Sequence, residues 1–373
     1  MPNLTPYALQ FLGGFHIGTR GVNLEEAGIS IPSDTLFAAL LDCLSRTGAD
    51  LDEFIRGYQT DPPFLLTSAF PYVGKLRFYP MPVDSARLFG PQKTVQYGKR
   101  LGRIRYLSEG LLKEALSSGR LEDWLFPEDE DDEPQKGVTL QEHNLWLKVE
   151  EIPQLPKAFQ YREGRRHAMP RLDVWKTDQV PHVTLDRITS ASNIFHAGRM
   201  EFEDECGLWF GVQWRRPQAD FSGKKFQAAF EKGFHILSED GLGGERSTGQ
   251  GAFSYRQMET ASLPDAKSGQ LAYLLSRFHP TSLEAQAALA DPKSAYKLSA
   301  VSGWLRSFGS PAQRRQRLFL VESGSLIRAG EGILGDLVDV RPRYDGKLAV
   351  PHPVYRLGLA LAAGWSAGGG DHA

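Results

Sequence analysis

The glycine-rich stretch DGLGGERSTGQGAF at residues 240–253 constrains the fold of this chain more than any other feature. Five glycines fall between Gly241 and Gly251. Glycine reaches backbone conformations that other residues avoid, and without a Cβ it lets another backbone come close. A helical apolar pattern precedes the stretch and a strand-like alternation follows it. We therefore expect a loop that runs from a helix into a strand and over which a long polyanion can lie.

Two phosphate-binding motifs come close to this sequence but do not fit it. The P-loop spacing is present at Gly244 and Gly249, but Gln250 stands where the motif requires lysine. The dinucleotide fingerprint fails at Arg246, where it requires a third glycine. Both motifs run from a strand into a helix, whose N-terminus faces the anion, so the order expected here is the reverse. The loop therefore does not predict a mononucleotide site, and the remaining alternative is a glycine-rich turn without a ligand.

The composition is that of a globular protein, without the excess of positive charge that is typical of proteins that bind nucleic acid. The chain has 373 residues, enough for two domains, of which 41 % are hydrophobic and 24 % are charged. The formal net charge is −2, although acidic stretches can hide a local basic surface in this sum. A role in binding nucleic acid therefore has to come from a local surface.

The cysteines and the apolar segments indicate the cellular compartment of the protein. Cys43 and Cys206 have no cysteine partner at metal-ligand spacing, and no histidine cluster completes a metal site. No apolar stretch is long enough to span a bilayer, and the N-terminus has no signal-peptide pattern. We therefore expect a cytoplasmic protein with no cofactor, no metal and no membrane contact.

Apart from two insertions, the first 256 residues follow the order β-α-β-β-α-β, which is typical of ferredoxin-like (RRM-like) domains. A strand is expected over 7–17, ending near His16, and a helix begins at Pro32 with Ser33 or Asp34 as its N-cap. The other expected elements are two short strands around Pro71 and Tyr72, a strand over 206–216, a helix over 224–240 and a strand over 251–257. The fold class is therefore α+β, with a ferredoxin-like domain over 1–256 and a second, smaller domain of several strands and shorter helices over 257–373.

The two insertions differ in character. A helical insertion over about 90–150 contains the acidic run EDEDDE at 128–133, which repels itself and is expected to be disordered. The same insertion carries basic residues that form either a solvated face or a surface for RNA or a protein partner, with tyrosines between them: Lys99, Arg100, Arg103, Arg105, Tyr97 and Tyr106. The second insertion, over about 160–205, has alternating runs near 180–189 and 192–202 that predict a protruding β-hairpin.

The glycine-rich loop resembles that of the RAMP superfamily of CRISPR RNA-binding proteins, which has the form G-[IL]-G-G-x-R-S-x-G-x-G-x-[FY]. Three further stretches are similar to the subunit that holds the crRNA 5′ handle in type III-A (Csm) effector complexes: FHIG…IPSDTLFAAL at 15–40, PHVTLDRIT at 181–189 and HPVYRLGLAL at 352–361. The second stretch looks like the protruding thumb hairpin of that subunit, and the third looks like its C-terminal signature. The resemblance covers most of the chain.

This resemblance implies a fold and a function. The fold is two ferredoxin-like domains with the thumb inserted in the first. The function is a non-catalytic subunit that grips the repeat-derived 5′ handle of the crRNA and caps the backbone filament. Its neighbours are the large polymerase-like subunit and the repeating backbone subunit, and it meets target RNA only indirectly. Two alternatives remain: the equivalent subunit of a type III-B (Cmr) complex, and a metal-independent RAMP endoribonuclease that uses His16, His167 or His182 as general acid or base.

The candidate RNA-binding residues come from these features. The loop offers main-chain N–H groups, hydroxyls and Arg246 to phosphates, and the thumb offers rings and an arginine for stacking at the boundary between handle and guide. His16, at the rim of the sheet, contacts RNA or satisfies a hydrogen bond. The full set is Gly241, Gly243, Gly244, Arg246, Ser247, Thr248, Gly249, Gln250, Gly251, His16, Ser33, His182, Arg187, Asn193, Phe195, Lys99 and Arg103. We expect no catalytic residue and no metal ligand.

Overall fold

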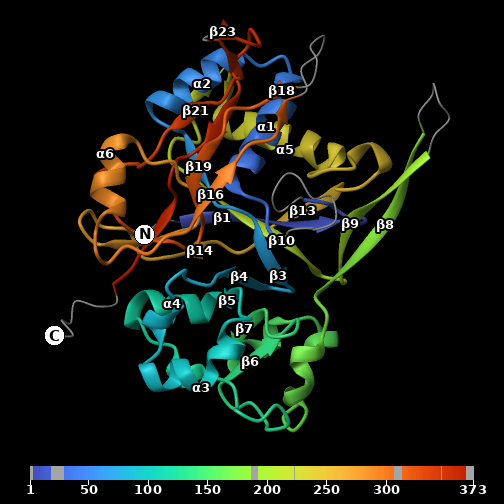
Figure 1. Cartoon of the computed structure of the whole chain (residues 1–373), viewed down its shortest axis with the longest axis vertical. Helices are drawn as coiled ribbons and strands as arrows, with labels where there is room; N and C mark the ends of the chain where they lie inside the picture. Colours follow the sequence, from blue (N-terminus) through green and yellow to red (C-terminus); the bar gives the residue numbers. More distant parts are fainter. Residues whose placement is uncertain are drawn as a thin grey trace.

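The computed structural model describes residues 3–17, 29–185, 192–221, 223–305, 313–345 and 347–366, with the backbone alone at 182, 184–185, 192–197 and 247. The chain has a mixed α+β architecture built on one large sheet, so the expected α+β class is confirmed (Figure 1). The strands of the sheet follow the order β13 (Phe253–Gln257), β1 (Asn3–Phe11), β10 (Cys206–Trp214), β3 (Phe70–Val73), β4 (Leu76–Pro80), β5 (Tyr106–Ser108), β7 (Leu145–Lys148), β6 (Gly137–Leu140), with β14 (Ala261–Ser262) beside β1 and β2 (Phe64–Leu66) beside β10.

Two helices, α1 (Ser33–Ser45) and α5 (Phe226–Asp240), pack against each other, and α5 also packs against β1 and β13. The apolar stripe predicted for α5 is confirmed, since Phe230 and Phe234 are buried and contact the ring of Tyr7 on β1. Gly233 lets the two helices approach closely, because a Cβ there would lie 2.9 Å from a methyl carbon of Leu44 on α1. The helix α2 (Leu51–Thr60) follows α1, and the short strands β11 (Asp220–Phe221) and β12 (Lys224–Lys225) precede α5.

Residues 85–171 form a distinct lobe, here called the insertion lobe, at the bottom of Figure 1. The lobe contains α3 (Pro91–Leu101), α4 (Glu109–Ser118), several short 3-10 turns and the strands β5, β6 and β7. β5 pairs antiparallel with β4 and parallel with β7, so the lobe extends the central sheet. The insertion expected to be helical therefore contains strands as well as helices.

The acidic run at 128–133 is held against the rest of the insertion lobe, although we expected it to be disordered. The carboxylate of Glu133 accepts hydrogen bonds from the N–H groups of Gly164 at 2.8 Å and Arg166 at 3.1 Å. Glu130 lies 3.9 Å from both Arg100 and His143. These donors and basic side chains offset the repulsion among the carboxylates, which the composition of the run alone does not reveal.

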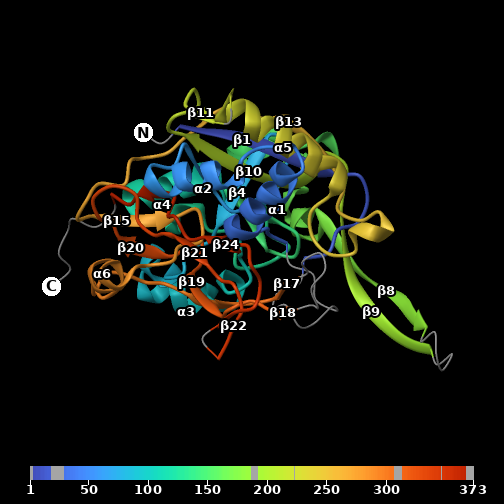
Figure 2. The ribbon, with the colours of Figure 1, turned by 90° about the horizontal axis from the view of Figure 1, so that it is seen from above.

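The second insertion forms a long hairpin. β8 (Trp175–Leu185) and β9 (Ser192–Phe202) pair antiparallel from Trp175–Phe202 to Leu185–Ser192. Both views show the hairpin projecting away from the body of the molecule (Figures 1 and 2). The hairpin predicted from the alternating runs is present, and residues 186–191 at its tip lie outside the described residues. Its role as a thumb stays a prediction.

The C-terminal segment, residues 257–366, is made of short strands. A three-stranded sheet has the order β20 (Leu326–Arg328), β15 (Leu271–Leu274), β25 (Ala362–Gly364). The remaining elements are the helix α6 (Ser282–Glu284), which continues into a π-helical turn, and the pairs β16 (Leu298–Val301) with β19 (Leu318–Val321), β17 (Trp304–Leu305) with β18 (Gln313–Arg314), β21 (Leu337–Asp339) with β24 (Tyr355–Leu357), and β22 (Arg343–Tyr344) with β23 (Lys347–Leu348). A second continuous ferredoxin-like sheet is not among these described elements.

β1 begins and ends earlier than the strand expected over 7–17. The chain beyond Phe11 leaves the sheet, and Phe15 pairs with Met200 while His16 pairs with Gly244 in separate bridges. His16 therefore does not end a strand at the rim. It lies, 4 % exposed, between the base of the hairpin and the glycine-rich loop.

Two further details differ from expectation. The N-cap of α1 is Pro32, which makes no side-chain cap hydrogen bond, and Ser33 and Asp34 lie buried in the first turn. The chain between β2 and β4 forms three strands instead of two and turns at Gly74, whose φ is +64°, so the expected turn at 71–72 lies inside β3. Ser33 and Asp34 do not cap α1 because their side chains bond to the C-terminal segment instead.

Asp34 joins α1 to the C-terminal segment through two arginines. One carboxylate oxygen accepts a hydrogen bond from Arg277 at 3.2 Å, and the other accepts from Arg356 at 2.8 Å. Arg277 also donates to both oxygens of Glu322, at 3.0 and 2.7 Å. Burial alone lowers the pKa of Arg277, but the carboxylates of Asp34 and Glu322 outweigh it and raise that pKa overall. The network fixes the segment against α1.

Asp34→Asn removes the negative charge on which Arg277 and Arg356 converge. Breaking a buried ion pair from one side costs about 3–5 kcal/mol, so we expect a clear drop in the urea concentration at the unfolding midpoint. The matched control is Asp42→Asn on the same helix, whose exposed carboxylate lies 3.6 Å from Arg46 and whose loss should change the midpoint little. Equal midpoints for the two variants would contradict this role of Asp34.

Candidate nucleic-acid interface

The glycine-rich loop connects α5 to β13, as the sequence predicts. Four of its glycines have positive φ: Gly241 at +81°, Gly243 at +98°, Gly249 at +85° and Gly251 at +83°. L residues are strained in this region, whereas glycine is not. Three of these positions also leave no room for a side chain. A Cβ would lie 2.7 Å from the carbonyl carbon of Gly251 at Gly241, 2.3 Å from the carbonyl oxygen of His16 at Gly243 and 2.1 Å from that of Leu242 at Gly251.

A short connector, residues 12–16, holds the loop from one side. The N–H of Gly251 donates to the carbonyl of Gly14 at 3.0 Å, and the N–H of Gly244 donates to the carbonyl of His16 at 2.8 Å. The N–H of Leu12 donates in turn to the carbonyl of Ala252 at 2.9 Å. The loop therefore has a fixed backbone along much of its length.

The same connector holds the base of the hairpin. Phe15 and Met200 exchange backbone hydrogen bonds of 2.9 and 3.0 Å. Nδ1 of His16 lies 2.6 Å from the carbonyl oxygen of Gly198 on β9, and because that oxygen can only accept, Nδ1 is the donor. His16 thus links the hairpin to the loop, which corresponds to the hydrogen-bonding role that we considered for it.

Most N–H groups of the loop already bond to the protein. The donors are Gly241, Leu242, Gly244, Thr248, Gly249, Gln250 and Gly251. We expected N–H groups along the whole loop to donate to phosphates. Among the described contacts, only the N–H groups of residues 243 and 245–247 are left without a carbonyl acceptor and remain available for this. The side chain of Arg246 is exposed and forms no ion pair with any described residue, so it is the main cation of the loop.

The other polar side chains of the loop differ from one another. The hydroxyl of Thr248 donates to the carbonyl of Glu245 at 2.7 Å and so shapes the loop. The Oε1 atom of Gln250 is buried and has no hydrogen-bond partner among the described residues. For Ser247 the structure describes the backbone alone. Arg246 therefore remains the side chain of the loop best placed to meet an anion.

The loop lines a cavity of about 1240 Å³ together with α1, α2 and the C-terminal segment. The loop contributes Gly243 and Arg246, and the C-terminal segment contributes Trp304, Arg315 and Arg356. Asp42 and Asp52 stand on the helical side. The cavity thus combines a glycine-rich wall with arginines and an exposed indole, which is the combination of groups that single-stranded nucleic acid requires.

The residues of the C-terminal segment in this cavity were not among our candidates. The sequence did carry a signal, the basic run QRRQR at 313–317 soon after Trp304. The run does not by itself predict a site, because its strand, β18, is only two residues long and no pattern in the sequence indicates that it lies near α1.

Several predicted residues lie away from this cavity. Ser33 is fully buried, and its hydroxyl accepts a hydrogen bond from the N–H of Arg277 at 2.9 Å, so it ties α1 to the C-terminal segment and is not available to RNA. Lys99 and Arg103 belong to the insertion lobe, where only Arg103 of the two lines a cavity. The predicted thumb residues lie outside the described side chains: His182, Arg187, Asn193 and Phe195.

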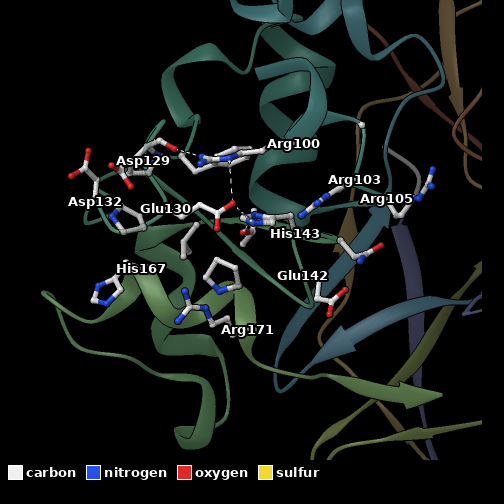
Figure 3. Close-up of a pocket in the computed structure, with 18 of the residues that line it drawn as sticks. Arg100, Arg103, Arg105, Asp129, Glu130, Asp132, Glu142, His143, His167 and Arg171 are labelled. Carbon is white, nitrogen blue, oxygen red and sulfur yellow. Dashed lines mark hydrogen bonds and ion pairs between the residues drawn. The ribbon is translucent and has the colours of Figure 1, made fainter. Parts of the chain in front are cut away.

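A second cavity, of about 690 Å³, lies in the insertion lobe and is lined by charges of both signs (Figure 3). Arg100 donates to the carbonyls of Pro127 and Glu128 at the start of the acidic run. Burial lowers the pKa of His143, with Arg100 acting in the same direction and Glu130 opposing it. Acidic and basic groups thus largely balance here, which fits an RNA backbone less well than a purely basic surface would.

The tyrosines between the basic residues do not offer stacking faces. Tyr97 and Tyr106 are both buried, at 9 % and 7 % exposed. Burial raises the pKa of Tyr106 to about 12. Both rings belong to the core of the lobe, so any RNA contact of the lobe would rest on its arginines and lysines.

The histidines considered for catalysis are not brought together. His16 lines the cavity of the glycine-rich loop, whereas His167 lines the cavity of the insertion lobe, with Nδ1 3.5 Å from Oε2 of Glu133. Over the described part of the chain, no group of three or more His, Cys, Asp or Glu side chains could hold a metal ion. Over the same residues, no helix is long and apolar enough to cross a membrane.

Known proteins share the sequence pattern of this chain. A family model for the CRISPR Csm4 C-terminal domain matches residues 267–365. The chain is 25 % identical over 345 residues to the CRISPR system Cms protein Csm4 of Thermococcus onnurineus (strain NA1), covering 89 % of this chain and 90 % of that protein. It is 24 % identical over 345 residues to the protein of the same name from Mycobacterium tuberculosis (strain CDC 1551 / Oshkosh), covering 91 % of each.

These matches support a Csm4 RAMP-type subunit. The resemblance drawn from the sequence motifs is therefore confirmed. The Csm4-type fold also agrees with solved structures: a chain of the Csm3–Csm4 subcomplex in the type III-A CRISPR-Cas interference complex superposes with a TM-score of 0.61 at 15 % identity, covering 96 % of this chain and 98 % of that one. A chain of the Csm1–Csm4 cassette in complex with cA4 gives a TM-score of 0.54 at 18 % identity, covering 99 % and 100 %. At such identities the likeness speaks for the fold alone.

Gly243→Ala should disturb the loop more than Gly249→Ala does. Both glycines have positive φ, where an L residue costs about 1–2 kcal/mol. A methyl group at 243 also collides with the carbonyl of His16, whereas one at 249 has nothing within 4 Å. We expect a lower urea midpoint and faster amide hydrogen exchange at Gly244 in the first variant than in the second. Identical exchange at Gly244 in both would show that the connector does not fix the loop.

Proposed function

We propose that this chain is the Csm4-type subunit of a type III-A CRISPR interference complex and that it binds the repeat-derived 5′ handle of the crRNA beside the glycine-rich loop. The observation that carries the proposal is the cavity that the loop shares with the C-terminal segment. Phosphates of a single strand need cations, and its bases need aromatic faces. Arg246, Arg315 and Trp304 supply both kinds of group at this cavity.

The loop has a defined part in this function. Gly249 has open space where a side chain would stand, and Gly243 and Gly251 follow a backbone path that other residues would strain. An RNA backbone can therefore approach the loop closely, with Arg246 pairing a phosphate. The N–H groups at 243 and 245–247 supplement that contact.

The partners follow from the similar proteins. Csm4 has been solved in a subcomplex with Csm3 and in a cassette with Csm1. We propose that this chain contacts a repeating backbone subunit of the first kind and a large polymerase-like subunit of the second kind, and that it caps the backbone filament. Target RNA would meet it only through the assembled complex, in the cytoplasm. The β8–β9 hairpin would then be the thumb at the boundary between handle and guide.

The domain organisation belongs to the same proposal. The order β13-β1-β10-β3 is what a ferredoxin-like sheet has when β1, β3, β10 and β13 are its successive strands. We assign residues 1–256 to this domain, with the insertion lobe and the hairpin between its second and third strands. Residues 257–373 form the second domain, which we regard as a divergent ferredoxin-like unit.

We infer that the subunit is not an enzyme. His16 is tied through Nδ1 to the carbonyl of Gly198, and His167 stands in the other cavity beside the carboxylate of Glu133, so the two histidines do not form an acid–base pair. The endoribonuclease alternative predicts otherwise and can be tested directly. The type III-B alternative differs in the identity of the neighbouring subunits, so the genes beside this one decide it.

Arg246→Ala should weaken binding of RNA that begins with the repeat-derived handle. Loss of one phosphate contact on a single strand should also lower the slope of log K against log salt by about 0.7. The measurement is fluorescence anisotropy with labelled crRNA from the host repeat, set against a shuffled RNA of equal length. The control is Lys232→Ala, an exposed cation on α5 away from the cavity, which should leave both quantities unchanged. Equal affinity and slope for Arg246→Ala and wild type would count against the proposed contact.

Purified protein incubated with precursor repeat RNA should produce no specific cleavage. The matched variants are His16→Ala and His167→Ala, analysed on the same denaturing gel. A product at one position that disappears in either variant would establish the endoribonuclease alternative. Cleavage at scattered positions that persists in both variants would indicate a contaminating nuclease and leave the non-catalytic assignment standing.

A further inference from the structure

The junction between α1 and the C-terminal segment holds more positive than negative charge. Both oxygens of Asp34 are taken, one by Arg277 and one by Arg356. Both oxygens of Glu322 are taken by Arg277. A third arginine, Arg315, lines the same cavity as Arg356 and has no carboxylate partner within the described chain. Three guanidinium groups therefore share two carboxylates, and one positive charge is left over.

The surroundings of Arg315 confirm that this charge is not compensated. Burial, together with the nearby charge of Arg356, lowers the pKa of Arg315 to about 10, and Asp34 offsets this only in part. The side chain is still protonated at neutral pH. Its Nε atom is buried and has no hydrogen-bond acceptor among the described residues. A buried donor without an acceptor is rare in native proteins and calls for an explanation.

An aromatic side chain stands beside this arginine. Trp304 is 61 % exposed although its indole is large and apolar. It sits on β17, paired with Arg314 of β18, whose guanidinium carbon lies 6.0 Å from the centroid of the indole ring. Arg315 follows in the chain and packs over Gly303, where a Cβ would lie 2.8 Å from its guanidinium. The β17–β18 pair thus presents an exposed ring and a free cation at one edge of the cavity.

We propose that Arg315 and Trp304 form a nucleotide subsite for single-stranded RNA, in which Arg315 pairs a phosphate and Trp304 stacks on the adjoining base. This inference rests on the proposed function and extends it to the C-terminal segment. An anion at the guanidinium group of Arg315 balances the repulsion from Arg356. Stacking on an exposed ring is tolerant of base identity, so the subsite holds a nucleotide without reading it. The glycine-rich loop and Arg246 line the same cavity and receive the neighbouring part of the strand.

A binding role and a structural role for Arg315 predict opposite effects on stability. An arginine that is repelled by Arg356 and has no carboxylate partner does not hold the fold together. We therefore expect Arg315→Gln to keep or raise the urea midpoint, because the substitution removes an uncompensated charge. Arg356→Gln should lower the midpoint, because it leaves Asp34 with one partner fewer. A midpoint for Arg315→Gln as low as that for Arg356→Gln would make Arg315 a structural residue and overturn the proposal.

The binding test uses the full chain and labelled crRNA that carries the handle of the host repeat. We expect Arg315→Gln to weaken binding about tenfold with a salt slope lower by about 0.7, and Trp304→Ala to weaken it by about five- to hundredfold. The control is Arg317→Gln, which removes a charge from the same basic run at an exposed position beside Phe319, outside the cavity lining. Its affinity should stay near that of wild type.

The outcomes separate this inference from the proposed function. If wild type prefers the handle and Arg246→Ala weakens binding, while Arg315→Gln and Trp304→Ala bind as wild type does, the subsite is wrong and the proposed function stands. An effect of Arg317→Gln equal to that of Arg315→Gln would mean general attraction by the basic run, and would also overturn the subsite. If wild type shows no preference for the handle, the proposed function fails; the subsite then stands as a site for single-stranded RNA only if Arg315→Gln and Trp304→Ala still weaken binding, and it fails too if they do not.

Discussion

A buried carboxylate joins the two halves of this molecule. Asp34 stands in the first turn of α1, and its two oxygens accept from two arginines that lie almost eighty residues apart in the C-terminal segment, Arg277 and Arg356. Taking such charges out of water is costly, so the arrangement is stable only when each oxygen and each guanidinium finds a partner. Arg277 meets that condition through Glu322 as well. The cavity exists because this contact fixes the C-terminal segment beside α1 and the glycine-rich loop.

A second constraint operates on the other side of the loop. The connector at residues 12–16 bonds to the loop through Gly14 and His16 and to the hairpin through Phe15 and the His16 ring. Two elements that are far apart in the sequence thus share one rigid support. Because the connector bonds to both, the base of the hairpin has a defined position relative to the loop. Gly251 both bonds to the connector and leaves no room for a side chain.

Local patterns predicted much of this architecture from the sequence. The helical spacing of Phe226, Phe230 and Phe234 predicted α5, and the order of helix, loop and strand around the glycines was correct. The position of His16 was not predictable from the sequence. It depends on the bridge between Phe15 and Met200 and on the bridge between His16 and Gly244, and no local sequence pattern indicates either bridge. The same holds for the acidic run, whose order comes from donors more than thirty residues away. Arg315 and Trp304 were missed because nothing in their own neighbourhood shows that they share a cavity with residue 246.

Crosslinking of crRNA within the assembled complex tests the location of the RNA most directly. A crRNA with 4-thiouridine in its handle would be bound by the complex, irradiated and digested, and the crosslinked peptides would be identified by mass spectrometry. RNA in the cavity of the glycine-rich loop predicts crosslinks to peptides that contain residues 241–251 and residues 303–317. Crosslinks confined to the insertion lobe, residues 85–171, would place the handle at the other cavity and contradict the account.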